Sequence, residues 1–290
     1  MLPNGLEVID TPAEVHLAVD VLKNGDRVEV VSRARNWTRI RLSDGRSGWV
    51  ESKGLLDATT YERGQNLLKE LIALPPQAAG HLMAASNLRL EPSRDAPLLA
   101  QLDEKRPVEV FGRRVVERPS DSDQSSSVPV PEAWYLVRGE GRAGWVLGRA
   151  VALDIPEALS PYAQASNLVA WVVLDSVEDG GQQVPQYLAA DRIGTQDLDF
   201  NHIRVFTWWV KDHRYVTAYV ESKLNGYFPI RVLRVNGIPC FRLRLMDDQG
   251  HKFQKVYGLF NTITRPVGVV DGWESDAMPT APLPRRKRRR

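Results

Sequence analysis

The stretch WTRIRLSDGRSGWV at residues 37–50 is the strongest fold signal, because a second version, WYLVRGEGRAGWV, occupies residues 134–146. Each version opens on Trp, turns at an acidic residue followed by Gly, and closes on Gly-Trp-Val. Glycine supplies the positive φ that a tight hairpin needs, and a Gly before a strand Trp is typical of a close backbone approach. The two stretches therefore predict two β-hairpins built to one plan.

A matching segment precedes each hairpin. Residues 22–30, LKNGDRVEV, align with residues 102–110, LDEKRPVEV, and both predict a turn followed by a strand that alternates apolar and polar residues. The second copy has a longer stretch between this strand and its Trp, rich in serine, proline and acidic residues. Such a composition cannot build a core, so we predict a disordered surface loop over residues 117–131.

Together these anchors resemble the bacterial SH3 domain. The second copy also has residues 86–93, SNLRLEPS, which are similar to that family's Asn-(Val/Leu)-Arg-x-x-Pro-Ser opening, whereas the first copy departs from it at residues 13–18. The resemblance implies small, strongly bent barrels at residues 8–57 and 81–154. Such domains occur mostly in bacterial cell-envelope proteins, where some bind peptidoglycan or peptides and many only space other domains.

Residues 58–80 predict a helical linker between the two copies. Thr59 or Thr60 can act as the N-cap, and Pro75 with Pro76 ends the helix. Apolar residues recur at helical spacing on one face: Leu67, Leu68, Leu71 and Ile72. We expect this helix to fix the angle between the barrels.

The candidate ligand-binding residues lie in the two hairpins. An aromatic ring with a polar edge suits sugars and peptides, so Trp37 and Trp134 are candidates to line a groove. Three neighbours complete the candidate set: Arg46, Tyr135 and Arg142. The alternative is that all four Trp of the two copies belong to the barrel core or rim, with Trp49 and Trp145 as the safer core positions.

Residues 160–272 predict an antiparallel meander of six or seven strands, an uncharacterised β-rich domain that closes as a barrel or folds as a sandwich. The strand-like runs are residues 167–177, 184–193, 203–210, 215–220, 227–235, 241–246 and 253–264. The fold class is therefore all-β, with two small SH3-like barrels joined by a short helix and followed by this meander. Alternation of Arg242 and Arg244 with apolar residues predicts a solvated basic face, to which Arg231 and Arg234 contribute; the alternative is a surface for an anionic ligand.

Charge is concentrated at the C-terminal end. The chain carries a net charge of +2, but Arg285–Arg290 are all basic, so the rest of the chain is mildly acidic. We expect residues 277–290 to form a disordered basic tail, which either attracts an anionic surface or is simply solvated.

The sequence shows no catalytic or metal-binding pattern. Cys240 is the single cysteine, which excludes an internal disulfide and a multi-cysteine metal site, and we expect it to be a small buried hydrophobe. Asp197, Asp199 and His202 are close enough to share a cation, but such a loop usually only binds water. No catalytic residue, metal or cofactor is therefore assigned.

These observations predict a non-catalytic binding or scaffolding protein of the bacterial cell envelope. Its SH3-type modules would bind peptidoglycan or a peptide, of the wall or of another protein, and position the β-rich domain. The alternative is an envelope enzyme whose C-terminal domain is catalytic and is targeted by the SH3 modules. The chain has no apolar run long enough to span a membrane and no signal peptide in its first residues, so it is either exported after losing a leader or cytoplasmic.

Overall fold

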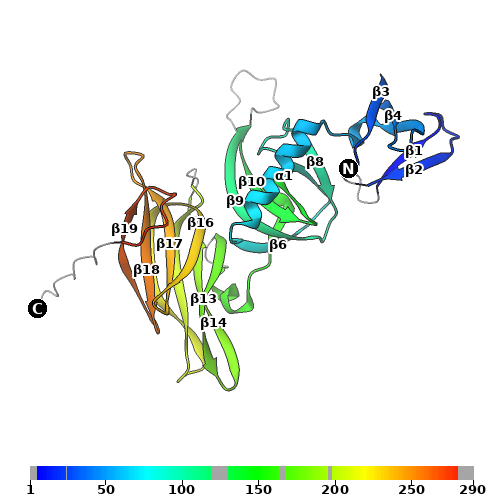
Figure 1. The fold of residues 1–290 in the computed structure, drawn as a ribbon. Coiled ribbons are helices and arrows are strands. Elements are labelled where there is room, and N and C mark those ends of the chain that lie inside the picture. Colours follow the sequence, from blue (N-terminus) through cyan, green and yellow to red (C-terminus); the bar gives the residue numbers. More distant parts are fainter. Residues whose placement is uncertain (1–4, 24, 119–129, 164–166, 195–197, 280–290) are drawn as a thin grey trace, which may run out of the picture.

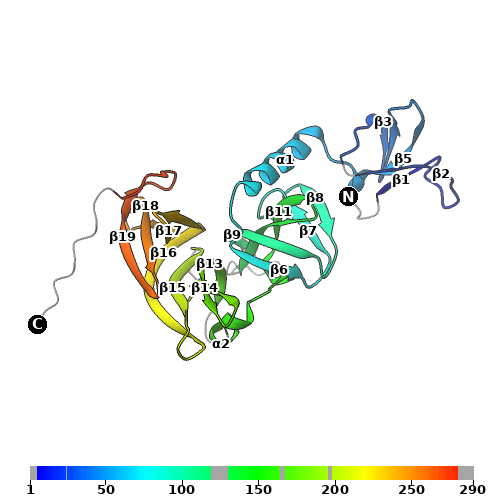
Figure 2. The same cartoon turned by 60° about the horizontal axis from the view of Figure 1, so that its bottom comes forward.

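The computed structural model describes residues 5–23, 25–118, 130–163, 167–194 and 198–279. Within these ranges the chain forms three antiparallel sheets that follow one another in sequence, with one long helix between the first and the second (Figure 1). The second sheet lies between the other two in both ribbon views (Figures 1 and 2). The all-β prediction is confirmed.

The first sheet has five strands in the order β2-β1-β5-β4-β3. Their bounds are β1 (Leu6–Ile9), β2 (Ala18–Leu22), β3 (Glu29–Ala34), β4 (Trp37–Arg41) and β5 (Ser47–Glu51), and a 3-10 turn follows at Ser52–Gly54. Alternate residues of these strands, with Leu42 just after β4, meet in a small core: Leu6, Val8, Leu22, Ile40, Leu42 and Val50. The sheet therefore buries one face, as the alternating pattern requires.

The second sheet has seven strands in the order β12-β6-β9-β10-β11-β7-β8. Their bounds are β6 (Ala78–Leu82), β7 (Ser86–Arg89), β8 (Leu98–Leu102), β9 (Pro107–Arg118), β10 (Val130–Gly139), β11 (Arg142–Leu147) and, after a 3-10 turn, β12 (Val151–Leu153). Five of these strands repeat the order of the first sheet, with β7 to β11 in the places of β1 to β5. The two others, β6 and β12, extend the sheet beyond β9.

The pairing register also repeats. Trp37 faces Glu51 across the first hairpin, and Trp134 faces Leu147 across the second. Three positions further along each strand, Ile40 faces Gly48 and Val137 faces Gly144. The repeat that is visible in the sequence is therefore also a repeat of strand geometry.

Gly48 and Gly144 make equivalent close contacts. A Cβ atom on Gly48 would lie 2.9 Å from the carbonyl oxygen of Ile9, and one on Gly144 would lie 2.7 Å from that of Arg89. Because no Cβ can be accommodated so close to backbone, both positions require glycine. The predicted close approach is confirmed, as is the positive φ of the hairpin glycines at 45 and 141.

The predicted bounds of the loop at residues 117–131 are wrong at both ends. Glu117 and Pro131 face each other in the second-last residue pair between β9 and β10, so both belong to strands. Residues 119–129 lie outside the described ranges. The serine-rich composition does not show where the strands end, because the pairing of β9 with β10 is set by the residues before and after the serine-rich segment.

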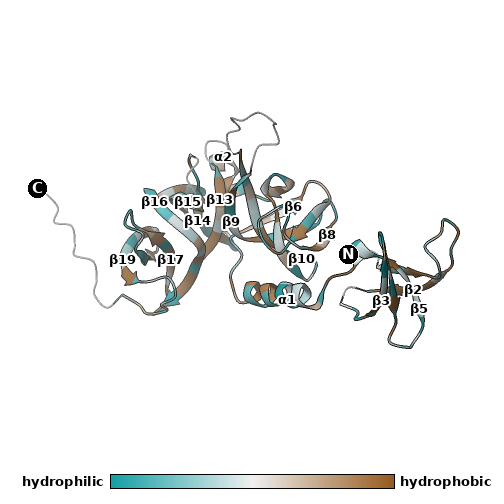
Figure 3. Ribbon diagram, turned by 90° about the horizontal axis from the view of Figure 1, so that it is seen from above, coloured by the Kyte–Doolittle hydropathy of each residue, from teal (hydrophilic) through white to brown (hydrophobic). Residues whose placement is uncertain are grey.

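Helix α1 (Ala58–Ile72) packs on the second sheet (Figure 3). Its N-cap is Asp57, whose carboxylate accepts a hydrogen bond of 2.9 Å from the backbone N–H of Thr60, so the predicted cap at Thr59 or Thr60 is wrong. The buried side of the helix carries Leu71, which contacts Phe111 and Ala143. The helix is therefore fixed to the second sheet, and only its first turns approach the first sheet.

The third sheet is a meander of seven strands in sequence order, reached through a 3-10 turn (Glu157–Leu159) and the short helix α2 (Ser160–Ala163). The strands are β13 (Leu168–Asp179), β14 (Gln182–Asp191), β15 (Phe200–Trp209), β16 (Arg214–Val235), β17 (Ile238–Met246), β18 (Lys252–Phe260) and β19 (Ile263–Asp271). Its interior contains sixteen buried residues, among them Phe200, Phe241, Leu243 and Tyr257. The predicted meander is confirmed.

Two predicted strand boundaries in the meander are wrong. The runs at 215–220 and 227–235 are one continuous strand, β16, because the polar residues between them pair with β15, and Glu221 receives hydrogen bonds from Tyr219, Tyr257 and Lys255. The single run at 253–264 is two strands, which turn at Asn261 with a φ of 57°. β19 then continues through Pro266, which is tolerated at the edge of the sheet.

Gln77 joins the second and third sheets. Its side chain is fully buried, and its amide oxygen accepts a hydrogen bond of 2.7 Å from the backbone N–H of Ile230 in β16. The amide nitrogen donates to the carbonyl oxygens of Pro75 and Ile230, and the Gln77 carbonyl oxygen accepts from the N–H of Trp171 in β13. The side-chain amide of glutamine both accepts and donates hydrogen bonds, so it can pair with the N–H and the carbonyl oxygen of Ile230 at the same time.

Replacing Gln77 with alanine is expected to lower the free energy of unfolding by about 1–3 kcal/mol, because the buried N–H of Ile230 loses its acceptor. Urea unfolding followed by tryptophan fluorescence measures the change. Gln182→Ala, at an exposed hairpin position, is the control and should stay within about 0.5 kcal/mol of the wild type. Equal stabilities of the two variants would show that the joint contributes nothing.

Candidate binding site

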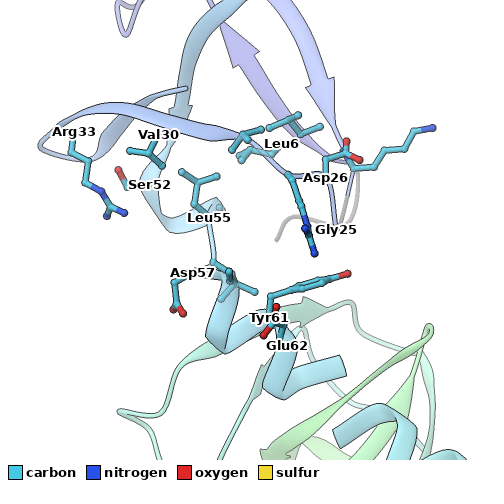
Figure 4. Close-up of a pocket in the computed structure, with 17 residues that line it drawn as sticks. Leu6, Gly25, Asp26, Val30, Arg33, Ser52, Leu55, Asp57, Tyr61 and Glu62 are labelled. Atoms are coloured by element: carbon cyan, nitrogen blue, oxygen red, sulfur yellow. The ribbon is translucent and has the colours of Figure 1, made fainter. Parts of the chain in front are cut away.

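A cavity of about 590 Å³ lies between the first sheet and the start of α1 (Figure 4). This volume falls within the range of about 300–1,000 Å³ that is typical of ligand sites. Its apolar wall is formed by Leu6, Leu22, Val28, Val30, Leu55 and Leu56, and its charged or polar rim includes Lys23, Asp26, Arg27, Arg33, Asp57, Tyr61 and Glu62. An apolar wall with a few polar groups at its rim is a suitable binding surface for a peptide or an amphipathic sugar.

The turn between β2 and β3 closes one end of the cavity against the helix. Gly25 has a φ of 96° and lies so close to Tyr61 that a Cβ atom would be 2.9 Å from the phenol oxygen. Asp26 accepts a hydrogen bond from the backbone N–H of Lys23, which fixes the same turn. The positive φ at residue 25 therefore favours glycine, and the turn that connects β2 to β3 holds the wall in place.

The opposite wall is set by the residues that connect the first sheet to α1. Leu55 packs against the core of the first sheet, and Asp57 caps the helix that carries Tyr61. Hydrogen bonds from Thr60 hold the pKa of the Asp57 carboxyl below its usual value. The carboxylate therefore stays charged at neutral pH and keeps the first turn of α1 in position beside the cavity.

Three rim residues are free to meet a ligand. Within the part of the chain that the structure describes, neither Arg27 nor Arg33 takes part in an ion pair, and Glu62 also has no cationic partner. Val30 is 44% exposed although it lines the apolar wall. The cavity therefore presents unpartnered cations beside uncovered apolar surface.

None of the five candidate residues from the sequence lines this cavity. Trp37 is half-buried at the end of the first sheet, opposite Ala34. Arg46 is exposed, but its guanidinium binds the carboxylates of Asp44 and Asp20 and the carbonyl oxygen of Val19. Arg46 therefore fastens its hairpin to β2.

The other three candidates lie on the second sheet and do not form one site. Trp134 is only 2% exposed, so the prediction that it lines an open groove is wrong. Tyr135 packs against the core of the second sheet. Arg142 lines a hollow of about 30 Å³ beside α1, together with Tyr61 and Leu99 among others, and this volume is too small for a sugar or a peptide.

The exposures of the four tryptophans fit the alternative prediction of barrel core or rim, but the choice of Trp49 and Trp145 as the core positions is wrong. Trp49 and Trp145 are only partly buried, and the Arg114 guanidinium covers the ring of Trp145 at 5.5 Å. Trp134 is the buried ring because β9 and β10 continue beyond it. Trp37, by contrast, faces the last residue of β3 and so lies at the margin of its sheet.

Three of the four arginines of the predicted basic face are paired with or covered by the segment after the last strand, whereas Arg234 stays 56% exposed. Arg242 is 5% exposed, and its guanidinium donates to the carbonyl oxygens of Ser275 and Asp276. Burial lowers the pKa of Arg244, which stacks on Trp273. Arg231 pairs with Asp276, and Arg234 pairs with Asp175. The sequence does contain a signal for this covering segment. Residues 273–276, which follow the last strand, contain aromatic and acidic side chains and can therefore contact arginines.

No metal-binding cluster of three or more His, Cys, Asp or Glu residues occurs in the described ranges. Asp197 lies outside them. Asp199 accepts a hydrogen bond from the N–H of Phe228, and His202 binds Asp191, so these two side chains serve the fold. Cys240 is buried, as predicted, and burial raises the pKa of its thiol. No described helix is long and apolar enough to cross a membrane.

Comparison with known proteins identifies one segment of the chain. No curated protein matches it. Two solved structures, NlpC2 and NlpC1 from Trichomonas vaginalis, each share 10% sequence identity with this chain at a TM-score of 0.19. The NlpC2 match covers 77% of this chain and 94% of NlpC2. The NlpC1 match covers 94% of this chain and 90% of NlpC1. Residues 12–56, which form most of the cavity wall, match the model of the bacterial SH3 domain. This chain therefore contains a bacterial SH3 domain at residues 12–56.

Proposed function

We propose that this protein is a non-catalytic binding protein of the bacterial cell envelope, and that its first SH3 domain binds a cell-wall peptide or glycan in the cavity beside α1 (Figure 4). Bacterial SH3 domains are typically associated with the cell wall, which supports this compartment. The observation that carries the proposal is the open cavity, because it is formed mostly by SH3-domain residues and has unpartnered arginines at its rim.

The second sheet is, in this proposal, a second SH3 module that serves as a connector. Its five repeated strands, its register and the contact of Gly144 all reproduce those of the first. It differs in being covered, by α1 on one side and by the Gln77 joint on the other. A module that is covered in this way positions its neighbours, so we assign binding to the first module and spacing to the second.

The remaining parts of the chain have supporting roles. The third sheet is presented by the connector, and Arg285–Arg290, which lie outside the described residues, supply positive charge for an anionic wall polymer. Hydrogen-bonded His–Asp pairs in the third sheet, such as His202 with the fully buried Asp191, hold strands together. This role supports a scaffold over an enzyme.

Retention of the protein on purified peptidoglycan tests the binding site. Val30→Glu should weaken retention about tenfold or more, because it places a charge on the apolar wall of the cavity. Val31→Glu is a matched control, since Val31 is 43% exposed on the same strand but does not line the cavity. Its retention should equal that of the wild type.

The same assay separates the alternatives. A wild-type protein that is not retained would overturn the cell-wall proposal, and equal loss in both variants would place the binding surface elsewhere. Release of soluble wall fragments during incubation would show that the protein is an enzyme.

A further inference from the structure

The second sheet shows what occupies the place that the cavity leaves open in the first. There β6 pairs with the outer edge of β9, with Ala78 opposite Val110 and Gly80 opposite Val108. On its other side β6 pairs with β12, where Val151 faces Leu82. The side chains of Ala78, Leu82 and Val151 complete the core of this sheet.

The first sheet has residues equivalent to those of β9 and to Val151, but no strand equivalent to β6 between them. Eighty positions separate the copies in this part of the repeat, so Val30 and Val28 occupy the places of Val110 and Val108. Leu55 follows the 3-10 turn of the first sheet as Val151 follows that of the second. In the described part of the chain no strand pairs with the outer edge of β3, and Val28, Val30 and Leu55 all line the cavity.

We propose that the first SH3 domain binds an extended peptide, which adds as an antiparallel strand to the outer edge of β3 and lies between that edge and Leu55. This inference rests on the proposed function and specifies its ligand class and binding mode. Addition of a strand to a free sheet edge gives affinity through main-chain hydrogen bonds and specificity through alternate side chains.

Strand β6 indicates which side chains the site accepts. Its residues 78, 80 and 82 point inward and are buried, and a Cβ atom on Gly80 would lie 2.6 Å from the carbonyl oxygen of Ala152. A peptide with small residues at two alternate positions and an apolar residue at the third therefore matches this pattern. The apolar residue would contact Leu22, which stands where the buried Leu102 stands in the second sheet.

The charged rim adds one further preference. His81 of β6 faces Pro107, and the first sheet has Arg27 at the equivalent position. Residues directly opposite each other in an antiparallel pair project to the same side. Because Arg27 takes part in no ion pair within the described residues, an acidic residue at this position of the peptide is favoured.

The probe is a fluorescein-labelled peptide Ala-Ala-Gly-Glu-Leu, and fluorescence anisotropy with the full chain measures its binding. Successive backbone N–H groups of a strand point to its two opposite edges. Two versions of the peptide are therefore made, each N-methylated at the amides that point to one of these edges. One version should bind at least about tenfold more weakly, because it cannot donate to β3. Binding of the probe with no difference between either version and the parent would overturn strand addition, as would no binding at all.

A charge exchange tests the register without altering the peptide backbone. Arg27→Glu should weaken the Glu peptide and favour a Lys peptide of otherwise identical sequence. Arg39→Glu, on β4 and away from the cavity, should change neither affinity. If Val30→Glu abolishes retention on peptidoglycan while both N-methylated peptides bind like the parent, the proposed function stands and strand addition is wrong. If wild type binds neither peptidoglycan nor peptide, both proposals fail.

Discussion

Replacing Trp134 with alanine is expected to destabilise the second sheet by about 3–5 kcal/mol, the usual cost of removing a fully buried large aromatic side chain. Trp134 is 2% exposed and is paired on both sides, with Arg114 of β9 and Leu147 of β11. The loss combines the apolar area returned to water with the cavity that the indole leaves behind. Urea unfolding of the full chain, with hydrogen exchange of the β9–β11 amides to locate the effect, measures it.

Trp37→Ala is the matched control, because Trp37 occupies the equivalent position of the first sheet. Its ring is only half-buried at the end of the sheet, so the expected cost is below about 2 kcal/mol. Neither substitution should reduce retention on peptidoglycan while the protein is folded, since neither ring lines the cavity. A larger loss of stability at Trp37 than at Trp134 would contradict the burial pattern.

Replacing Asp191 with alanine is expected to destabilise the third sheet by about 3–5 kcal/mol, because it removes the partner of a buried charge. Asp191 is fully buried and accepts two hydrogen bonds from the Arg204 guanidinium, both at 2.9 Å, and a third from His202 at 2.8 Å. Arg204 is itself only 14% exposed, so water cannot replace the carboxylate. Urea unfolding of the full chain measures the loss, and hydrogen exchange of the β14 and β15 amides locates it.

Asp175→Ala provides the comparison within the same sheet. Asp175 pairs with Arg234, but this pair is more exposed, with 28% and 56% of the side chains accessible. Exposed ion pairs contribute less than about 1 kcal/mol, so this variant should remain close to the wild type. Equal effects at 175 and 191 would show that burial does not set the strength of the Asp191 cluster.

Several features of this protein could be predicted from local sequence. The two Trp hairpins, their turn glycines, the close approach at Gly48 and Gly144, and the helix between the copies all follow from patterns within about fifteen residues. Hairpin turns and amphipathic helices are determined by φ preferences and by the spacing of apolar side chains, which the sequence displays directly. The β-meander follows for the same reason, apart from its boundaries at β16 and β19.

The candidate site could not be predicted in this way, because burial depends on partners far away in the sequence. Trp37 and Trp134 have the same local pattern, yet only Trp134 is buried, since β9 and β10 continue past it. Arg242 alternates with apolar residues as a surface residue would, but residues 275 and 276 cover it.

The cavity has the same origin. Val30 and Val110 occupy equivalent strands, but β6 covers only Val110. Local sequence patterns were enough to predict the repeated hairpins and an all-β chain. Which sheet has a filled core and which has an open cavity depends on long-range packing, because strand β6 and helix α1 both pack on the second sheet.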